Sequence, residues 1–198
     1  MSEHCAAIVL AAGASTRLGQ PKQLLALNGE TLLRRTVRLA QQAGCNPVFV
    51  VLGFEAARMQ QELSCLEAIP VINADWPSGM GSSLRSGIEA VMKKSPEPQK
   101  TLILLCDQPT LSTELLSNLL RTSTEANSLL TASSYAGRLG VPAIFDKQLY
   151  SDLLKVGGDQ GARSVIQRYI DLTSAVEFPG GIIDIDTPAD LPNLTSDM

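Results

Sequence analysis

The sequence is poor in the residues that build zinc sites and nucleic-acid-binding faces. It has one histidine, His4, and its four cysteines form no C-x-x-C pair, so we expect no zinc site. The net charge is −4 at pH 7 and there is no basic tract, which argues against a nucleic-acid partner. A nucleotide remains possible as a ligand, because a local cluster of cations is enough to bind one.

Long apolar runs are also missing. No run approaches the roughly 20 residues that are needed to cross a bilayer. The apolar stretch that follows His4 and Cys5 is too short for a signal peptide. Scattered cysteines without a pairing pattern are typical of reduced thiols. We therefore expect a cytoplasmic protein that has no membrane partner.

Aromatic residues are scarce at 4% of the chain, so Leu, Ile, Val and Ala must fill the core. With 198 residues, of which 44% are hydrophobic and 18% charged, the chain has the size and composition of one globular α/β domain. We find no repeat, linker or low-complexity segment. Residues 1–198 are therefore predicted to form a single domain.

Strands and helices are predicted to alternate through the first two-thirds of the chain. The predicted strands are 6–12, 48–52, 69–73 and 101–106, and the predicted helices are 31–43, 54–63, 84–92 and one that Ser112 caps. This order indicates a three-layer, Rossmann-like α/β fold, a mostly parallel sheet with helices on both faces. The strand 101–106 is the most apolar, so we expect it at the centre. After Ser128 the pattern is less regular.

The organising stretch is Leu10–Lys22, which reads L-A-A-G-A-S-T-R-L-G-Q-P-K. It follows the first predicted strand. Its small residues allow close approach, and Gly13 and Gly19 can take backbone angles closed to other residues. Such a turn can point several backbone N–H groups at one anion. Arg17 and Lys22 add two cations, so the loop is predicted to bind a polyphosphate.

The spacing in this loop excludes two better-known phosphate motifs. G-x-x-x-x-G-K-[ST] fails because five residues separate Gly13 from Gly19 and Gln20 follows. G-x-G-x-x-G fails because no glycine lies two residues after Gly13. An ordinary surface loop is the alternative for one glycine-rich stretch. The position after the first strand, with Arg and Lys inside the loop, favours phosphate binding.

Two carboxylates are candidate metal ligands. Asp107 follows the central strand in C-D-Q-P, at the sheet edge where ligands of open parallel sheets bind. Asp186 lies in I-I-D-I-D-T-P-A-D-L, after a predicted short strand over 182–185 that would put Asp184 on the same face. Beside a polyphosphate, both would suit Mg²⁺. The alternatives are a turn at Asp107 and a solvated residue beside a helix cap at Asp186.

The residues after Asp186 predict the start of a helix. Thr187, Pro188 and Asp190 fit the N-cap, the first helical position and the acid of a capping box.

The loop L-A-A-G-x-S-x-R-x-G-x-x-K resembles the opening signature of the MobA-like nucleotidyltransferases, and within them most the molybdenum cofactor cytidylyltransferase group. The resemblance extends over nearly the whole chain and implies a fold of the nucleotide-diphospho-sugar transferase type. It supports Asp107 and Asp186 as metal ligands, through C-D-Q-P-like and D-x-D-T-P-x-D-L motifs. The nucleotide contacts in the first loop would come from Leu10, Ala11, Ala12, Gly13, Ser15, Arg17 and Lys22.

Later motifs also resemble this family. The segment 75–85 is similar to its W-x-x-G-M-x-x-S-L-R motif and implies further nucleotide contacts, from Gly79, Met80, Ser82 and Ser83. Trp76 is there either a packing anchor or a base-stacking platform. Segments 140–145 and 157–163 resemble two more motifs and imply acceptor contacts from Gly140, Pro142 and Arg163. Val141 stands where the family often has histidine, which removes any acceptor contact of that histidine.

The expected activity is transfer of a nucleoside monophosphate, CMP from CTP, to the phosphate of the molybdopterin form of the molybdenum cofactor, with release of pyrophosphate. Lys22 is assigned to the α-phosphate, Arg17 to the β- and γ-phosphates, and Asp107 with Asp186 to Mg²⁺ or Mn²⁺. The resemblance also implies a molybdoenzyme or an insertion chaperone as partner. Two alternatives stay open: a related transferase that uses GTP or a sugar or alcohol phosphate, and a non-catalytic nucleotide-binding insertion partner.

Overall fold

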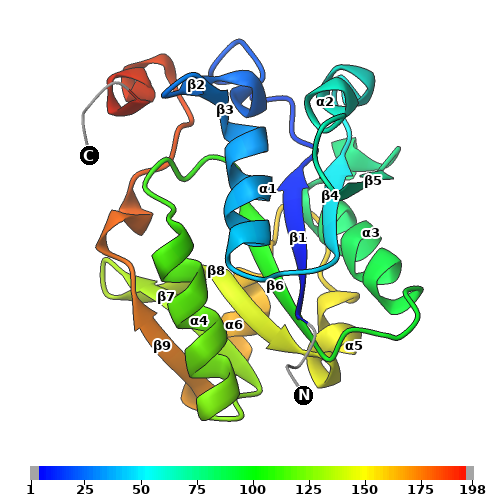
Figure 1. The fold of residues 1–198 in the computed structure, drawn as a ribbon, viewed down its shortest axis with the longest axis vertical. Coiled ribbons are helices and arrows are strands. Elements are labelled where there is room, and N and C mark those ends of the chain that lie inside the picture. The colour runs from blue at the N-terminus through cyan, green and yellow to red at the C-terminus, as the bar shows by residue number, and fades with distance from the viewer. Residues whose placement is uncertain (1–4, 195–198) are drawn as a thin grey trace.

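The computed structural model describes residues 5–194, so His4 lies outside the described residues. Its main sheet has seven strands in the order β5-β4-β1-β6-β8-β7-β9 (Figure 1). Strand β8 runs antiparallel to both of its neighbours, and the other neighbouring pairs are parallel. The strands are β1 Cys5–Ala11, β4 Val48–Leu52, β5 Ala68–Ile72, β6 Lys100–Leu105, β7 Leu130–Tyr135, β8 Arg138–Asp146 and β9 Thr173–Glu177. The predicted mostly parallel sheet is confirmed.

Helices cover both faces of this sheet, which confirms the predicted three layers. They are α1 Leu32–Gln42, α2 Ala56–Glu62, α3 Met80–Met92, α4 Thr113–Glu125, α5 Tyr150–Leu153 and α6 Arg163–Arg168. In Figure 1, α1 and α4 lie in front of the sheet and α6 lies behind it. Alternate residues of β1 feed the two cores: Ala7 and Val9 pack with α1, α2 and α4, whereas Ala6 and Ile8 pack with α3, α5 and α6.

The continuous apolar runs form strands of the sheet, and helices cover both faces of that sheet. All seven residues of β1 are buried, as expected for a strand inside a parallel sheet. Strand β6 is the fourth of seven, which confirms its predicted central place. As a result the segments that follow β1 and β6 leave the sheet side by side at the same edge.

Two helices start at side-chain caps, of which the cap at Ser112 was predicted. The Thr31 hydroxyl oxygen accepts the Arg34 N–H at the start of α1, and the Ser112 hydroxyl oxygen accepts the Leu115 N–H at the start of α4. Gly44 follows α1 with a φ of +98°, a value that favours glycine.

The predicted strand over 182–185 is wrong. Residues Pro179–Ile182 form a 3₁₀ helix, and residues 183–186 are irregular. The glycines at 180 and 181 favour a tight turn, and Ile182 is 60% exposed, so its apolar side chain is not part of a sheet face. Only Ile185 is fully buried, in a small cluster with Leu18, Leu27 and Leu32. The segment therefore crosses the end of the sheet without adding a strand.

Two small elements flank this C-terminal segment. The two-stranded hairpin of β2 Ala26–Leu27 and β3 Glu30–Thr31 precedes α1. The 3₁₀ helix Pro188–Leu194 lies beside that hairpin, where Leu191 packs on the small cluster (Figure 1). None of the helices among residues 5–194 has both the length and the apolar character that a bilayer crossing requires.

Candidate functional site

The loop after β1 is shaped by Ser15 more than by Gly13. Ser15 has a φ of +52°, and its carbonyl oxygen accepts N–H groups of Leu18 at 3.0 Å and Gly19 at 3.2 Å. Its hydroxyl oxygen accepts the Lys22 backbone N–H at 3.1 Å. Gly19 uses the predicted left-handed region with a φ of +75°, but Gly13 does not. At Gly13 an added Cβ would meet no atom within 4 Å, so this glycine leaves open space beside the loop.

The loop is held from beneath by Gln23, which sequence reasoning missed. Its side chain is 1% exposed and donates to the Ala11 carbonyl at 2.9 Å and the Gly13 carbonyl at 2.8 Å. These bonds fix the place where the chain leaves β1, because they tie its last carbonyl and that of Gly13 to one buried side chain. A glutamine directly after the predicted phosphate-binding lysine, at the start of an apolar run, was the available signal.

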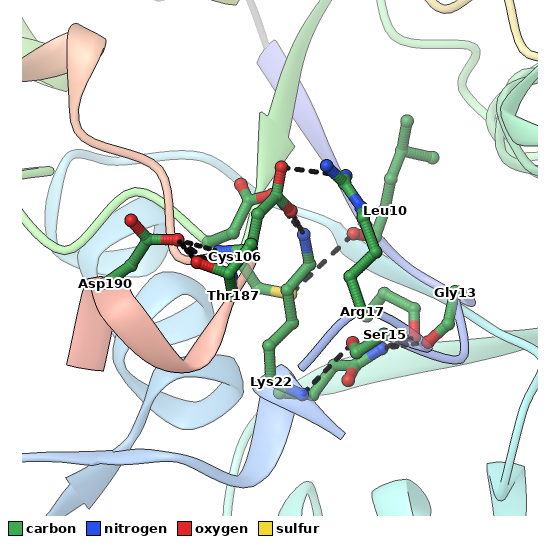
Figure 2. Close-up of polar contacts among 12 residues, drawn as sticks. Leu10, Gly13, Ser15, Arg17, Lys22, Cys106, Thr187 and Asp190 are labelled. Carbon is green, nitrogen blue, oxygen red and sulfur yellow. Dashed lines mark hydrogen bonds and ion pairs between the residues drawn. The ribbon is translucent and has the colours of Figure 1, made fainter. Parts of the chain in front are cut away.

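Lys22 lies between the two predicted metal ligands (Figure 2). Its ammonium nitrogen Nζ is 2.5 Å from Asp107 Oδ2 and 3.0 Å from Asp186 Oδ1. Arg17 reaches the other oxygen of Asp186, with 3.0 Å between Nη2 and Oδ2. The Lys22 and Asp107 side chains are 19% and 11% exposed, whereas Arg17 is 71% exposed. The structure thus brings the two predicted cations and the two predicted carboxylates into one cluster.

The electrostatics of this cluster favour the charged forms. Burial acts to lower the pKa of Lys22, but attraction to Asp107 and hydrogen bonds to both carboxylates outweigh it, so the pKa lies above its ordinary value. Partial burial acts to raise the pKa of Asp186, but Lys22 and Arg17 outweigh it and lower that pKa. Burial, followed by the charge of Asp107, raises the pKa of the nearby Cys106 thiol to about 12. Cys106 therefore stays protonated at neutral pH.

The two carboxylates meet because the C-terminal segment is hydrogen-bonded to the end of β6. The Ile185 N–H donates to the Asp107 carbonyl oxygen at 2.9 Å. The Asp190 carboxylate accepts the N–H groups of Asp186 at 3.1 Å and Thr187 at 2.7 Å, and the Thr187 hydroxyl at 2.9 Å. Of the predicted capping box, the contacts that the acid Asp190 makes are thus present. The helix that follows is 3₁₀ rather than α.

The chemistry of the carboxylates fits a hard divalent cation. Oxygen Oδ1 of Asp107 is buried and has no hydrogen-bond partner. An unpartnered buried carboxylate oxygen is costly unless a donor or a cation reaches it. No group of three or more His, Cys, Asp or Glu side chains within 5–194 is arranged to hold a metal. A two-carboxylate site suits Mg²⁺ or Mn²⁺, which can take further oxygens from phosphates and water.

The loop, together with Lys22 and Asp107 of the cluster, lines a cavity of about 390 Å³. Of the predicted nucleotide-binding residues, those that line it are Leu10, Ala11, Ala12, Gly13, Ser15, Lys22, Gly79, Met80 and Ser83. Asp107 lines it as well, whereas Arg17 and Asp186 lie outside the lining. The cavity therefore gathers segments that are far apart in the sequence at the end of β1 and β6.

The Ser82 hydroxyl serves the loop itself. It is buried, donates to the carbonyls of Asp75 and Gly79 at 2.9 Å each, and accepts from the Asn73 amide at 2.9 Å. The same Asn73 amide donates to the Ser83 hydroxyl oxygen at 3.0 Å. Asn73 is thus a second supporting residue that sequence reasoning missed. A direct nucleotide contact of Ser82 stays a prediction.

Trp76 is a packing residue that also lines the cavity. Its ring packs edge-on against Phe54, with 5.7 Å between the ring centroids, and it also lines the cavity. Its packing is tight, because a Cβ at Gly53 would lie 2.6 Å from Trp76 Cβ. The tryptophan is therefore a fixed wall of the cavity, and base stacking on it stays open.

A second cavity of about 260 Å³ adjoins the first. Two of the three predicted acceptor residues, Gly140 and Arg163, line it, and so does Val141. Pro142 lies outside the lining, and its carbonyl oxygen accepts the Ser133 hydroxyl at 2.8 Å. Sequence reasoning missed Tyr135 and Arg138, whose guanidinium lies 5.5 Å above the Tyr135 ring.

Asp184 faces this second cavity rather than sharing the metal site with Asp186. Partial burial, followed by the charges of Asp107 and Asp186, raises the pKa of Asp184 to about 6. Because Arg138, Arg163 and Asp159 also line this cavity, its lining holds two cations and two carboxyl groups.

The fold and the cavity at its carboxyl edge define a nucleotidyltransferase type of architecture. The sequence matches the MobA-like NTP transferase domain over residues 7–173, and the chain belongs to this family.

The proteins to which this chain is similar are named for different activities. The chain is 35% identical to nicotine blue oxidoreductase of Paenarthrobacter nicotinovorans, over 91% of both chains. It is 29% identical to the purine catabolism protein PucB of Bacillus subtilis, over 94% of both chains. It also resembles Rv0371c of Mycobacterium tuberculosis H37Rv, solved as a complex with manganese, with a TM-score of 0.79, 25% identity, and coverage of 96% of this chain and 97% of that one. These relatives support the family, and they do not single out the cytidylyltransferase group that the sequence motifs suggested.

Proposed function

We propose that this protein transfers a nucleoside monophosphate, CMP from CTP, to the phosphate of a molybdopterin-type acceptor. The observation that carries the proposal is the contact of Lys22 with Asp107 and Asp186, because Lys22 and Asp107 line a cavity that the loop after β1 also lines. Beside it lies a second cavity whose lining includes Arg138 and Arg163, two cations that could bind an anionic acceptor. The acceptor itself, and a recipient molybdoenzyme or insertion chaperone, rest on the sequence resemblance.

The proposed reaction joins an oxygen of the acceptor phosphate to the α-phosphorus of the nucleotide. The bond between the α-phosphorus and the bridging oxygen to the β-phosphorus breaks, and its electron pair leaves with pyrophosphate. Such a transfer needs alignment and charge neutralisation more than a nucleophilic side chain. This agrees with the protonated state of Cys106.

Lys22 and Arg17 have two sets of partners in this proposal. In the free protein both are bound to carboxylates. When the nucleotide binds, Lys22 moves to the α-phosphate and Arg17 to the β- and γ-phosphates. Asp107 and Asp186 are then released to hold the divalent cation. The cation would neutralise phosphate charge and orient the α-phosphate.

Arg163 and Arg138 would hold the anionic groups of the acceptor in the second cavity. Arginine suits this task, because its planar fork can donate two hydrogen bonds to one phosphate or carboxylate. Asp184 and Tyr135 would accept or donate hydrogen bonds at the polar edge of the acceptor's ring system.

The test is pyrophosphate release measured with CTP, GTP, ATP and UTP, each with Mg²⁺ and molybdopterin. We expect release and a CMP–molybdopterin conjugate with CTP. Release with GTP alone would move the assignment to the guanylyl reaction. Binding of nucleotide without any release would support the non-catalytic insertion partner instead.

One relative's name favours a second candidate, reduction of a conjugated heterocycle in the same cavities. It follows from the 35% identity to nicotine blue oxidoreductase over 91% of both chains. The discriminating assay is decolourisation of nicotine blue with NADH or NADPH as hydride donor and no nucleoside triphosphate. Turnover in that assay, with none in the pyrophosphate assay, would favour this candidate.

A further inference from the structure

The two cavities share part of their lining. Leu10 and Leu105 come from the ends of β1 and β6, whereas Met80 and Asp159 come from two separate loops, and all four line both cavities. The cavities are therefore adjoining halves of one cleft. Met80 and Asp159 lie where the two halves meet.

The two loops that carry these residues are locked together by backbone contacts. The Gly81 N–H donates to the Gly158 carbonyl oxygen at 2.9 Å. Gly79 has a φ of +106°, and a Cβ there would lie 2.5 Å from the Gly158 carbonyl carbon and oxygen. A side chain at Gly79 would therefore both strain the backbone and push the loops apart. The glycines therefore allow the segments 79–81 and 157–158 to come into backbone contact.

Met80 is the side chain held at this junction. A Cβ at Gly161 would lie 2.6 Å from the Met80 sulfur, so the absence of a side chain at 161 makes room for the thioether. Met80 is nevertheless 41% exposed, so its side chain is accessible to ligands in either half of the cleft. A thioether on three rotatable bonds can adapt its shape to ligands on either side.

We propose that Met80 is a positioning residue that forms the movable partition between the nucleotide and the acceptor halves of the cleft. This inference rests on the proposed transfer reaction. The acceptor oxygen and the α-phosphorus must approach to about 3–3.5 Å, and this approach takes place at the boundary between the halves. With both ligands bound, Met80 packs between them and closes the boundary to water.

Because the loops are locked together, the partition also couples the two binding events. A nucleotide that packs against Met80 fixes the loop 79–81, and through Gly158 the loop 157–161. The acceptor then meets a loop that is already ordered and loses less conformational entropy on binding. Nucleotide and acceptor are therefore expected to bind with positive cooperativity.

Truncation of the partition should admit water to the α-phosphorus. A water oxygen then forms the new bond, the same α–β bridge breaks, and the products are CMP, pyrophosphate and a proton. The predicted signature of a missing partition is thus pyrophosphate release that is no longer matched by conjugate.

The experiment compares the wild type with Met80→Ala, Met80→Leu and Met92→Ala. Met92 is the matched control, because it is an exposed methionine at the other end of the same helix. For Met80→Ala we expect the ratio of CMP to CMP–molybdopterin to rise roughly tenfold. Affinity for an uncleavable α,β-methylene analogue of CTP should no longer tighten when molybdopterin is added. Met80→Leu should keep the wild-type ratio, since it restores an apolar side chain of similar volume.

Gly161→Ala supplies an independent variant that leaves the methionine in place. Its new Cβ displaces the Met80 sulfur, so we expect the ratio of CMP to CMP–molybdopterin to rise, but by less than in Met80→Ala. An unchanged ratio and unchanged cooperativity in Met80→Ala would overturn the partition. So would a parallel loss of analogue binding, which would make Met80 a nucleotide contact only. If wild-type protein forms no conjugate with any of the four triphosphates, the proposed function fails first and this inference falls with it.

Discussion

The Lys22 ammonium lies 2.5 Å from the Asp107 carboxylate, and this contact joins the loop after β1 to the end of β6. The lysine was expected to be an exposed phosphate ligand, but its side chain is only 19% exposed and is paired with two acids. In the free protein it neutralises charges that would repel one another by roughly 4 kcal/mol at ~4 Å and an effective dielectric near 20. A nucleotide that uses Lys22 must therefore replace Asp107 and Asp186 as the partners of its ammonium group.

Replacing Lys22 with alanine should remove most turnover and also lower stability. The loss of stability follows because Asp107 is left buried beside Asp186 without its cation, and we expect about 1–3 kcal/mol at pH 7. Lys22→Arg should recover part of the turnover and part of the stability. Recovery is incomplete because a flat guanidinium presents its charge differently from a compact ammonium. Urea unfolding and pyrophosphate release measure the two effects. Wild-type turnover in Lys22→Ala would remove the lysine from the mechanism.

Activity should depend strictly on Mg²⁺ or Mn²⁺, and Asp107→Asn should abolish it. Oxygen Oδ1 of Asp107 is buried without a partner, so an amide there would offer a cation one neutral oxygen in place of a charged carboxylate. Asp186→Asn should have a milder effect that is seen as a higher Mg²⁺ requirement. Activity against Mg²⁺ concentration for the three proteins is the measurement. Full activity in EDTA would contradict this prediction.

Asp184→Asn should stabilise the protein at pH 8. The folded-state pKa of Asp184 is raised to about 6, so the folded protein holds this proton more tightly than the unfolded chain, whose pKa is about 3.9. The resulting stability is present below the unfolded pKa and is lost as pH rises through about 6. Because the side chain is partly exposed, we expect a gain of about 1 kcal/mol or less in the variant at pH 8 and none at pH 3.5.

The control for this pH test is Asp171→Asn, at an exposed aspartate that lines neither of the two cavities. Denaturant unfolding at both pH values should leave it unchanged. An equal gain at pH 3.5 and pH 8 in Asp184→Asn would show that charge is not the cause.

Gln23→Leu should weaken both the fold and nucleotide binding. The substitution removes two donors from the carbonyls of Ala11 and Gly13, at an expected cost of about 1–3 kcal/mol. Gln20→Ala is the matched control, because Gln20 is an exposed glutamine of the same loop. Thermal unfolding and a CTP titration follow both variants. Equal effects in the two would argue against the supporting role of Gln23.

The choice of base should reside in the segments 11–14 and 75–83, not in the phosphate-binding residues. All four triphosphates carry the same phosphates, so contacts to these cannot discriminate between bases. Both segments line the first cavity. Exchanging residues in them should change the relative kcat/KM for CTP and GTP, whereas Arg17→Ala should lower both alike. An unchanged preference after both exchanges would place base selection elsewhere.

The sequence predicted those features that depend on local pattern. The fully buried β1, the cap at Ser112 and the central place of β6 follow from apolar runs and a capping residue. The juxtaposition of Asp107 with the loop after β1 followed from the rule that parallel strands deliver their ends to one edge.

Other features depend on which partner a residue finds in space, which no local pattern encodes. Ile182 is apolar enough for a strand, but the glycines before it turn the chain, and β9 occupies the sheet edge. Gln23 and Asn73 are polar residues whose support of the site comes from carbonyl and hydroxyl groups that folding brings near them. The pairing of Lys22 with both acids likewise depends on contacts across more than 80 residues of sequence.

The crossing of segment 183–187 over the end of β6 has a consequence for the order of events during synthesis. Asp186 is made 164 residues after Lys22, when all seven strands of the sheet have already been synthesised. A nascent chain that ends after β9 contains every strand but lacks the acid that binds Arg17 and Lys22. In the proposed mechanism, such a chain therefore has the strands of the sheet before it has both of its metal-binding acids.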